Sequence, residues 1–192
     1  RLGGHDLQVR PEEAKRLCGF VPDRPHVYEK LSVREFLEFV AGLYHVPGQE
    51  VRRRSDELLE LFDLTAVADE LMESFSHGMK QRAALAAALV HAPRILVLDE
   101  PMVGMDPRGA RLLKATFRQL AASGVCVFVS THSLDVAEET CDRIGVIHRG
   151  RLAAVGTLDE LRSAAGGDAT MRLESAFLRL TGDAGHAGAA AG

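Results

Sequence analysis

The run ILVL (95–98) constrains the fold of this chain more than any other feature, because it is apolar throughout and ends on two acids, Asp99 and Glu100. A second apolar run, VCVFVS (125–130), follows after a stretch of helical pattern. Strands that are apolar throughout and alternate with helices are typical of a parallel sheet that is buried on both faces. We therefore predict a layered α/β core, with LCGFV (17–21) as another of its strands.

A group of helices is expected between the strand at 17–21 and the strand at 95–98. The segment SVRE (32–35) is a capping box, and apolar residues follow it at helical spacing. A second helix is expected over 50–63, and a third from Ser76, a good N-cap residue, to Val90. Since no strand-like run interrupts these helices, we predict a helical subdomain inserted into the core.

The C-terminal third of the chain has shorter elements. We expect a short helix over 134–141 and a β-hairpin formed by 144–148 and 151–155. The segment TLDE (157–160) is a second capping box that opens another helix. The tail GDAGHAGAAAG (182–192) is rich in glycine and alanine, a composition typical of a disordered segment.

Composition excludes several classes of protein. A chain of 192 residues supports one sizeable core, and its net charge of −4 argues against a nucleic-acid surface, which is usually basic. Three widely spaced cysteines indicate buried thiols rather than a metal site or a disulfide framework. No apolar run approaches the length that spans a bilayer, and no signal peptide is evident. We expect any membrane association to depend on a partner.

The two acids after the run at 95–98 are candidates for nucleotide chemistry. Ligands of parallel α/β sheets bind at the carboxyl ends of the strands, where Asp99 and Glu100 would lie. Asp99 has the chemistry to hold Mg²⁺, and Glu100 has the chemistry to polarise an attacking water. The pattern alone leaves the choice open, because many α/β proteins end a strand with an acid.

Two further groups strengthen the nucleotide interpretation. Ser76 and Gly78 stand at a predicted helix N-terminus, where backbone N–H groups and the helix dipole favour an anion. His132 follows the run at 125–130 and would lie beside the two acids if the strands are neighbours. The alternatives are an ordinary N-cap serine and a structural histidine.

Four segments in this order and spacing resemble the ATP-binding cassette (ABC) family. They correspond to its signature motif, Walker B motif, D-loop and switch histidine, and they are FSHGMKQR (75–82), ILVLDEP (95–101), GMDP (104–107) and STH (130–132). GFVPD (19–23) resembles the strand that leads into the Q-loop of the family. The resemblance implies a P-loop NTPase-like core with an inserted helical subdomain, and it implies ATP and Mg²⁺ as cofactors.

The resemblance also implies roles for the catalytic residues. Asp99 would be the Mg²⁺-associated acid, Glu100 the general base or water-orienting residue, and His132 a contact to the γ-phosphate. Ser76 and Gly78 would close on the ATP of the opposite protomer.

Asp106 would couple the two nucleotide sites across the dimer. Asp23 stands where the family usually has glutamine, and its carboxylate would ligate Mg²⁺ or its water. His77 replaces the usual first glycine of the signature, and Met79 replaces the usual glutamine.

No GxxxxGK[ST] motif, the P-loop whose amides and lysine cradle the phosphates, occurs in the 192 residues. The family places it upstream of this sequence. We therefore expect an N-terminal truncation that removes the P-loop and its strand, and negligible ATP hydrolysis by this chain alone. The expected domains are a partial nucleotide-binding domain (1–165) and a C-terminal extension (166–192). Within the first, we expect a helical subdomain (31–91) and a core that contains the Walker B motif, the D-loop and the switch histidine (92–156).

Two segments point to one branch of the family. HVYEKLSVREFLEF (26–39) and ESAFLRLTG (174–182) resemble ATPases that serve ABC-2-type exporters. The implied partners are a membrane permease and a second cassette, with no nucleic acid, and the implied location is the cytoplasmic face of the membrane. A non-transport ABC ATPase and an inactive regulatory module are the alternatives that remain open.

Overall fold

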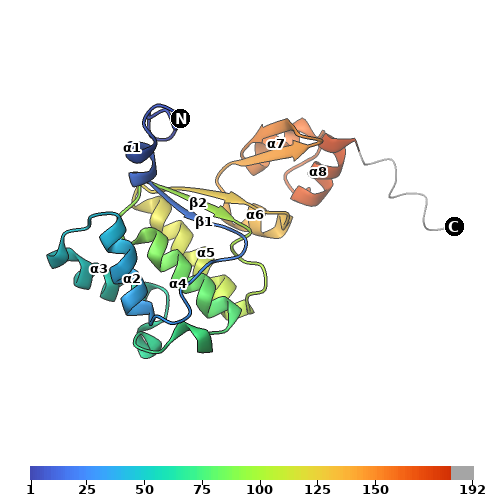
Figure 1. Cartoon of the computed structure of the whole chain (residues 1–192). Coiled ribbons are helices and arrows are strands. Elements are labelled where there is room, and N and C mark those ends of the chain that lie inside the picture. The colour runs from blue at the N-terminus through green and yellow to red at the C-terminus, as the bar shows by residue number, and fades with distance from the viewer. Residues whose placement is uncertain (183–192) are drawn as a thin grey trace. The chain divides into compact units, whose positions relative to one another are not determined.

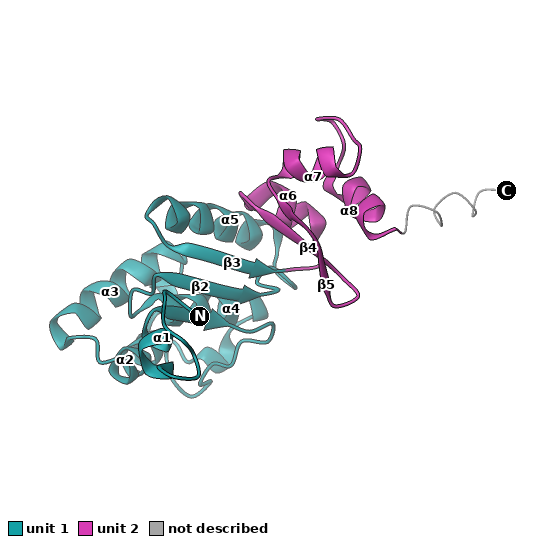
Figure 2. Ribbon diagram, turned by 90° about the horizontal axis from the view of Figure 1, so that it is seen from above, with its two compact units in different colours: residues 1–130 teal, residues 131–192 magenta. Residues whose placement is uncertain are grey.

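The computed structural model describes residues 1–182, which form two compact units, residues 1–130 and residues 131 onward (Figure 2). The helices of the first unit are α1 (Pro11–Arg16), α2 (Val33–Leu43), α3 (Gly48–Leu61), α4 (His77–Leu89) and α5 (Pro107–Ala122), with short 3₁₀ turns at Thr65–Val67 and Met72–Ser74. Its strands are β1 (Cys18–Val21), β2 (Ile95–Asp99) and β3 (Cys126–Ser130).

A parallel sheet of order β1-β2-β3 forms the centre of the first unit (Figure 1). The register aligns Phe20 with Val97 and Val97 with Phe128. Helix α4 packs against β1, and α5 packs against β3. The predicted α/β class is therefore confirmed, and β2, which ends on Asp99, is the middle strand.

Helices α2 and α4 begin at the capping residues that the sequence indicates. The Ser32 backbone N–H donates to Glu35 Oε2 (2.8 Å), and the Glu35 N–H donates to Ser32 Oγ (3.2 Å), which completes the predicted capping box of α2. Ser76 caps α4 and Asp106 caps α5. Each such cap contributes about 1 kcal/mol, because it satisfies an N–H group that has no partner within the helix.

One hydrophobic core joins the helices to the sheet. Its fully buried members include Leu37 of α2, Leu59 of α3, Leu85 of α4 and Leu96 of β2. Gly19 of β1 lies so close to α4 that an added Cβ would meet the carbonyl oxygen of Ala88 at 2.4 Å. The absence of a side chain at Gly19 thus permits α4 to approach the sheet.

The prediction that the strands are buried on both faces is wrong for β1 and β3. Phe20 and Phe128 are each 60% exposed, and Cys126 is exposed as well, contrary to the expectation of buried thiols. Burial alternates along β1 because the side chains of a strand point to opposite faces in turn, and α4 packs against one face. An apolar run shows that both faces suit burial, but it does not show what covers each face.

The second unit contains a β-hairpin and three helices. The predicted hairpin pairs β4 (Ile144–His148) with β5 (Arg151–Gly156), and α6 (Leu134–Thr140), α7 (Leu158–Ala164) and α8 (Leu173–Thr181) surround a separate core (Figure 2). Buried Leu161 and Leu173 belong to this core, so α7 and α8 share it across the expected domain boundary after residue 165, which stays a prediction.

The expected disordered tail lies, after Gly182, outside the described residues. Gly182 itself takes a left-handed conformation (φ 76°) at the end of α8, a backbone that glycine adopts without a steric penalty. Within residues 1–182 no helix combines the length and the apolar character needed to cross a membrane.

Candidate functional site

The two predicted acids lie together at the carboxyl end of β2. Asp99 is the last residue of the strand and is aligned with Ser130 at the end of β3. The backbone N–H of Glu100 donates to the carbonyl of Ser130 (2.8 Å), so the chain continues the sheet pairing for one more residue. The structure thus places both carboxyl-bearing residues at the edge where parallel sheets bind ligands.

Glu100 has a backbone conformation that residues other than glycine rarely adopt. Its φ is +46°, in the left-handed region, and Pro101 follows it. A non-glycine residue in this region costs on the order of 1 kcal/mol. Backbone strain of this kind is concentrated at functional sites, which supports the choice of Glu100 as a candidate.

The carboxylate of Asp99 suits a magnesium ion that is shared with a nucleotide. Among residues 1–182 no group of three or more His, Cys, Asp or Glu side chains is arranged to hold a metal. Mg²⁺ bound to nucleotides typically uses one or two carboxylates and completes its shell with phosphate oxygens and waters. A single acid at a strand end therefore fits Mg²⁺ better than it fits a metal held entirely by protein ligands.

The signature residues form the N-terminus of α4. The Met79 N–H donates to Ser76 Oγ (3.3 Å), so Ser76 is an N-cap, the alternative that the sequence left open. This bond does not exclude anion binding, since the N–H groups of the first turn have no acceptor within the helix and carry the positive end of its dipole. Ser76 is exposed, as a ligand contact requires.

A cavity of about 730 Å³ joins the signature to the D-loop. Ser76 and Gly78 line it from α4, and Asp106 lines it from the start of α5. Neither Asp99 nor Glu100 is among its lining residues. Three of the predicted site residues are thus brought to one surface, and the two acids are not part of that surface.

Three arginines that sequence reasoning missed, Arg82, Arg108 and Arg111, also line this cavity. Arg82 of α4 donates from Nη1 to the carbonyl oxygens of Phe62 (2.8 Å) and Asp63 (3.1 Å). The Asp63 carboxylate lies 3.2 Å from Nη2 of Arg108 and 3.8 Å from Nη1 of Arg82. Arg82 belongs to the quoted segment FSHGMKQR, which is the signal that would have identified it.

His77 contacts the loop that leads to Asp106. Its Nε2 lies 3.2 Å from the carbonyl oxygen of Val103, and a Cβ added to Gly104 would lie 3.2 Å from its Cδ2. Gly104 has a φ of +72°, which favours glycine at this position. The histidine that replaces the usual signature glycine is therefore accommodated by a contact to the D-loop.

The remaining predicted residues are not among those that line this cavity. Asp23 is exposed and follows the end of β1 by two residues. His132 belongs to the second unit, immediately before the N-cap of α6. The proximity of Asp23 or His132 to the acids at β2 stays a prediction.

The model of a protein family described as ABC transporter matches residues 1–103, more than half of the chain. The chain belongs to the ABC transporter family. The signature motif and the Walker B acids lie within the matched residues, whereas the D-loop aspartate and the switch histidine follow them.

Curated ABC relatives include antibiotic-resistance proteins. The chain is 37% identical over 172 residues to the linearmycin resistance ATP-binding protein LnrL of Bacillus subtilis (strain 168), an alignment that covers 90% of this chain and 55% of LnrL. It is 40% identical over 168 residues to the daunorubicin resistance ATP-binding protein DrrA3 of Streptomyces coeruleorubidus, covering 87% of this chain and 53% of DrrA3. The chain thus spans about half the length of these relatives.

Solved structures show the same ABC fold. An ATP-binding subunit of an ABC transporter matches with a TM-score of 0.84 and 33% identity, over 93% of this chain and 74% of that subunit. A dimeric ATP-binding cassette in a post-hydrolysis state, bound to ADP and Pi, matches with a TM-score of 0.69 and 26% identity, over 81% of this chain and 68% of that cassette. The predicted P-loop NTPase-like class is confirmed by these matches.

A second, smaller cavity of about 200 Å³ lies beside β1 in this ABC protein. Val21 and His26 line it from the strand and the loop that follows, and Phe36 lines it from α2. The ring of Tyr28 contacts Phe36 (6.0 Å between centroids) and Phe39 (5.2 Å). Tyr28 and Phe39 are both exposed, so an aromatic surface adjoins the cavity.

A half-buried histidine, His91, packs against Tyr44, which lines the same smaller cavity. The His91 ring stacks on Tyr44 with 3.7 Å between centroids and 8° between planes. Its Nε2 lies 3.2 Å from the carbonyl oxygen of Cys18, which requires that Nε2 carry the proton. Burial lowers the pKa of His91, because a buried imidazolium loses its hydration.

Proposed function

We propose that this chain is part of the ATP-hydrolysing subunit of an ABC exporter, acting at the cytoplasmic face of a membrane as one of two cassettes. The observation that carries the proposal is the cavity that unites Ser76, Gly78 and Asp106 and leaves out Asp99 and Glu100. A surface that suits phosphate but lacks the acids of its own chain is suited to the nucleotide of a second cassette.

In this proposal the residues at the end of β2 perform the chemistry. Asp99 holds Mg²⁺, which supplies positive charge to the phosphate oxygens when it is bound with ATP. Glu100 accepts a proton from the attacking water, and its backbone strain is of the kind that is concentrated at functional sites. His132 would donate a hydrogen bond to the γ-phosphate, and the Asp23 carboxylate would ligate Mg²⁺ or its bound water.

The residues around the larger cavity act on the partner cassette. The first turn of α4, with Ser76 and Gly78, offers N–H groups to the γ-phosphate of the opposite nucleotide. Asp106 joins this surface to the loop that begins at Glu100, so the two sites are coupled. The relative that binds ADP and Pi is dimeric, which supports this arrangement.

The aromatic surface beside β1 is the proposed docking site for the permease. Its exposed members, Tyr28 and Phe39, contact each other and adjoin a cavity lined by His26, in the loop that follows Asp23, and by the buried Phe36. A change in the Asp23 loop would therefore reach the docking surface directly. The resistance functions named for LnrL and DrrA3 support export of an antibiotic-like molecule.

A mixed dimer of the full-length protein tests the trans arrangement. Ser76→Arg is placed in one protomer and Glu100→Gln in the other, with different affinity tags so that only the mixed dimer is purified. If both lesions fall on one ATP, the second site is intact, and ATP hydrolysis should remain at about half of the wild-type rate for independent sites.

The matched control has both substitutions in one protomer and none in the other. Each site then carries one lesion, and hydrolysis should be lost. Homodimers with each single substitution must be inactive for the comparison to hold. Equal hydrolysis rates from the two arrangements would rule out the trans assignment of Ser76.

A further inference from the structure

His132 lies two residues after the end of β3 and immediately before the N-cap of α6, a helix that contacts the C-terminal helices α7 and α8. Ser133 is the N-cap of α6, and its backbone N–H donates to Oγ1 of Thr131 (3.1 Å). Only one peptide bond separates His132 from the N-cap. Because α6 is short and its backbone is helical, a displacement of α6 also displaces His132.

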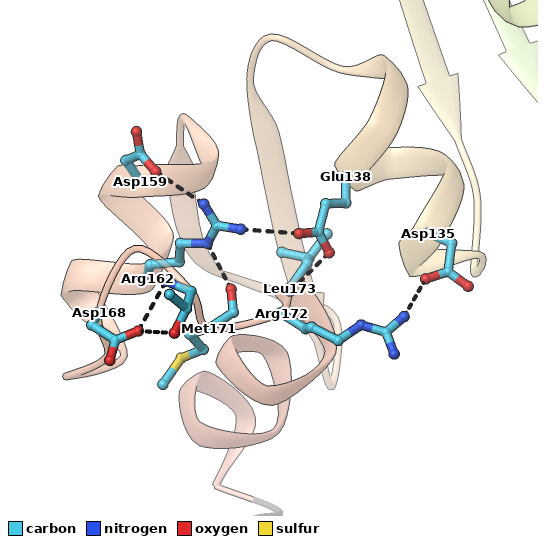
Figure 3. A network of polar contacts seen from close by, with 9 residues as sticks. Asp135, Glu138, Asp159, Arg162, Asp168, Met171, Arg172 and Leu173 are labelled. Carbon is cyan, nitrogen blue, oxygen red and sulfur yellow. Dashed lines mark hydrogen bonds and ion pairs between the residues drawn. The ribbon is translucent and has the colours of Figure 1, made fainter.

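Glu138 ties α6 to both of the following helices. Its Oε1 accepts from Nη2 of Arg162 on α7 (3.0 Å), and its Oε2 accepts from the backbone N–H of Leu173, the first residue of α8 (3.0 Å) (Figure 3). The Arg162 and Glu138 side chains are only 16% and 23% exposed. An ion pair this sheltered is screened much less than a surface pair.

Arg162 extends the same network from α7 to the segment before α8. Its Nε donates to the carbonyl oxygen of Met171 (2.6 Å), and its Nη1 donates to Oδ1 of Asp159 (3.1 Å). The guanidinium thus contacts three elements at once (Figure 3). A planar group with several fixed donors restricts the relative orientation of the groups it joins more strongly than a single bond does.

A second pair, between Asp135 and Arg172 (2.8 Å), joins α6 to the segment before α8 but is mostly exposed. Exposed pairs of this kind contribute little. Buried Leu161 and Leu173 connect α7 and α8 through the core of the unit. Ala137 of α6 is buried in the same core, so apolar packing and the polar contacts of Glu138 together set the position of α6 relative to α7 and α8.

We propose that Glu138 is a positioning residue for His132, so that α7 and α8 determine, through α6, where the imidazole stands during ATP hydrolysis. The inference rests on the proposed function, in which His132 contacts the γ-phosphate. It assigns a catalytic influence to C-terminal helices that contain none of the nucleotide motifs. Loss of the contacts of Glu138 lowers kcat and leaves the KM for ATP nearly unchanged, because His132 acts on the reacting phosphate.

The test uses steady-state ATP hydrolysis, with kcat and KM measured separately, by the full-length protein together with its permease in lipid vesicles. Glu138→Leu removes both contacts, and we expect kcat to fall about ten-fold, since a displacement near 1 Å costs up to about a hundred-fold in well-aligned sites. Glu138→Gln keeps an acceptor for the Leu173 N–H and should lose less. Glu174→Gln, on the exposed side of α8, is the matched control and should leave kcat unchanged.

A double-mutant cycle with His132→Ala separates positioning from mere stabilisation. If Glu138 acts through His132, Glu138→Leu should cause no further fall in the residual kcat of the His132→Ala protein. An equal fall in both backgrounds overturns the proposal. A Glu138→Leu protein that melts at a lower temperature but has a wild-type kcat, measured well below its melting temperature, also overturns the proposal.

A second variant and the His132→Ala protein alone distinguish failure of the positioning inference from failure of the proposed role of His132. If Glu138→Leu does not fold, Arg162→Lys retains a charge opposite Glu138 and removes the planar fork, and it should give a smaller fall in kcat that again disappears without His132. Wild-type turnover by His132→Ala would overturn the proposed role of His132 itself. An impaired His132→Ala protein with unaffected Glu138 and Arg162 variants would overturn only the positioning inference.

Discussion

Replacement of Gly19 by alanine should destabilise the first unit, because the new methyl group meets a backbone atom. A Cβ at this position would lie 2.4 Å from the carbonyl oxygen of Ala88 and 3.1 Å from Cδ1 of Leu96. The φ of Gly19 lies outside the left-handed region, so the cost arises from packing alone. A backbone oxygen cannot rotate away, and α4 must move relative to β1.

The magnitude follows from two opposing terms. Overpacking of a well-packed core costs about 1–3 kcal/mol, whereas Gly→Ala in the unfolded chain returns about 0.4–1 kcal/mol of conformational entropy. We expect Gly19→Ala to lower the free energy of unfolding by about 1–2 kcal/mol, which shifts the urea midpoint by about 0.5–1 M at a typical slope near 2 kcal/mol per M.

Gly42→Ala provides the matched control, since it makes the same chemical change in α2 with no atom within 4 Å of the new Cβ. It should stabilise the protein by about 0.5–1 kcal/mol, because glycine is a poor helix former. Urea unfolding of the full-length protein, followed by far-ultraviolet circular dichroism, measures both variants. A Gly19→Ala midpoint at or above that of the wild type would refute the packing argument.

Four further predictions test the site and its surroundings. Glu100→Gln in the full-length protein should abolish ATP turnover and preserve ATP binding, since the amide keeps the shape but loses the base; a near wild-type hydrolysis rate would show that Glu100 is not the base. The unfolded state should bind more protons than the folded state below about pH 6.5, because burial lowers the pKa of His91 from that value. Stability should therefore fall as the pH decreases from 6.5, and urea unfolding at a series of pH values should show a shallower fall for His91→Phe; an unchanged pH dependence would exclude His91 as its source. Cysteine introduced at Tyr28 should form crosslinks to a permease subunit in membranes, and their complete absence would contradict the docking surface. The 192-residue chain alone should hydrolyse ATP negligibly, because it contains no motif to cradle the phosphates, and robust Mg²⁺-dependent ATPase activity would disprove this.

The features that could be predicted best from the sequence are those that depend on neighbours within a few residues. The caps at Ser32, Ser76 and Asp106 each use an N–H group three residues away, so the local pattern contains both partners. The order of strands and helices followed from periodicity for the same reason. The position of the two acids at the end of β2 then required only that the strand be parallel to its neighbours.

Contacts between distant segments could not be predicted in this way. His77 contacts Val103, which is 26 residues further along the chain, and Arg82 contacts Asp63, which precedes it by 19 residues. The exposure of Phe20 and Phe128 depends on which helices pack against the sheet, and an apolar run carries no information about that. The network around Glu138 joins three helices whose mutual packing no single segment specifies.

The left-handed backbone of Glu100 has an evolutionary consequence. Glycine would relieve the steric penalty at this position, and asparagine would reduce it, so a lineage released from selection for hydrolysis gains stability by replacing the glutamate. Selection for stability alone would then favour these two amino acids at residue 100. On the proposed role of Glu100 as the base, a glutamate that persists in a descendant indicates that selection for hydrolysis has opposed this preference.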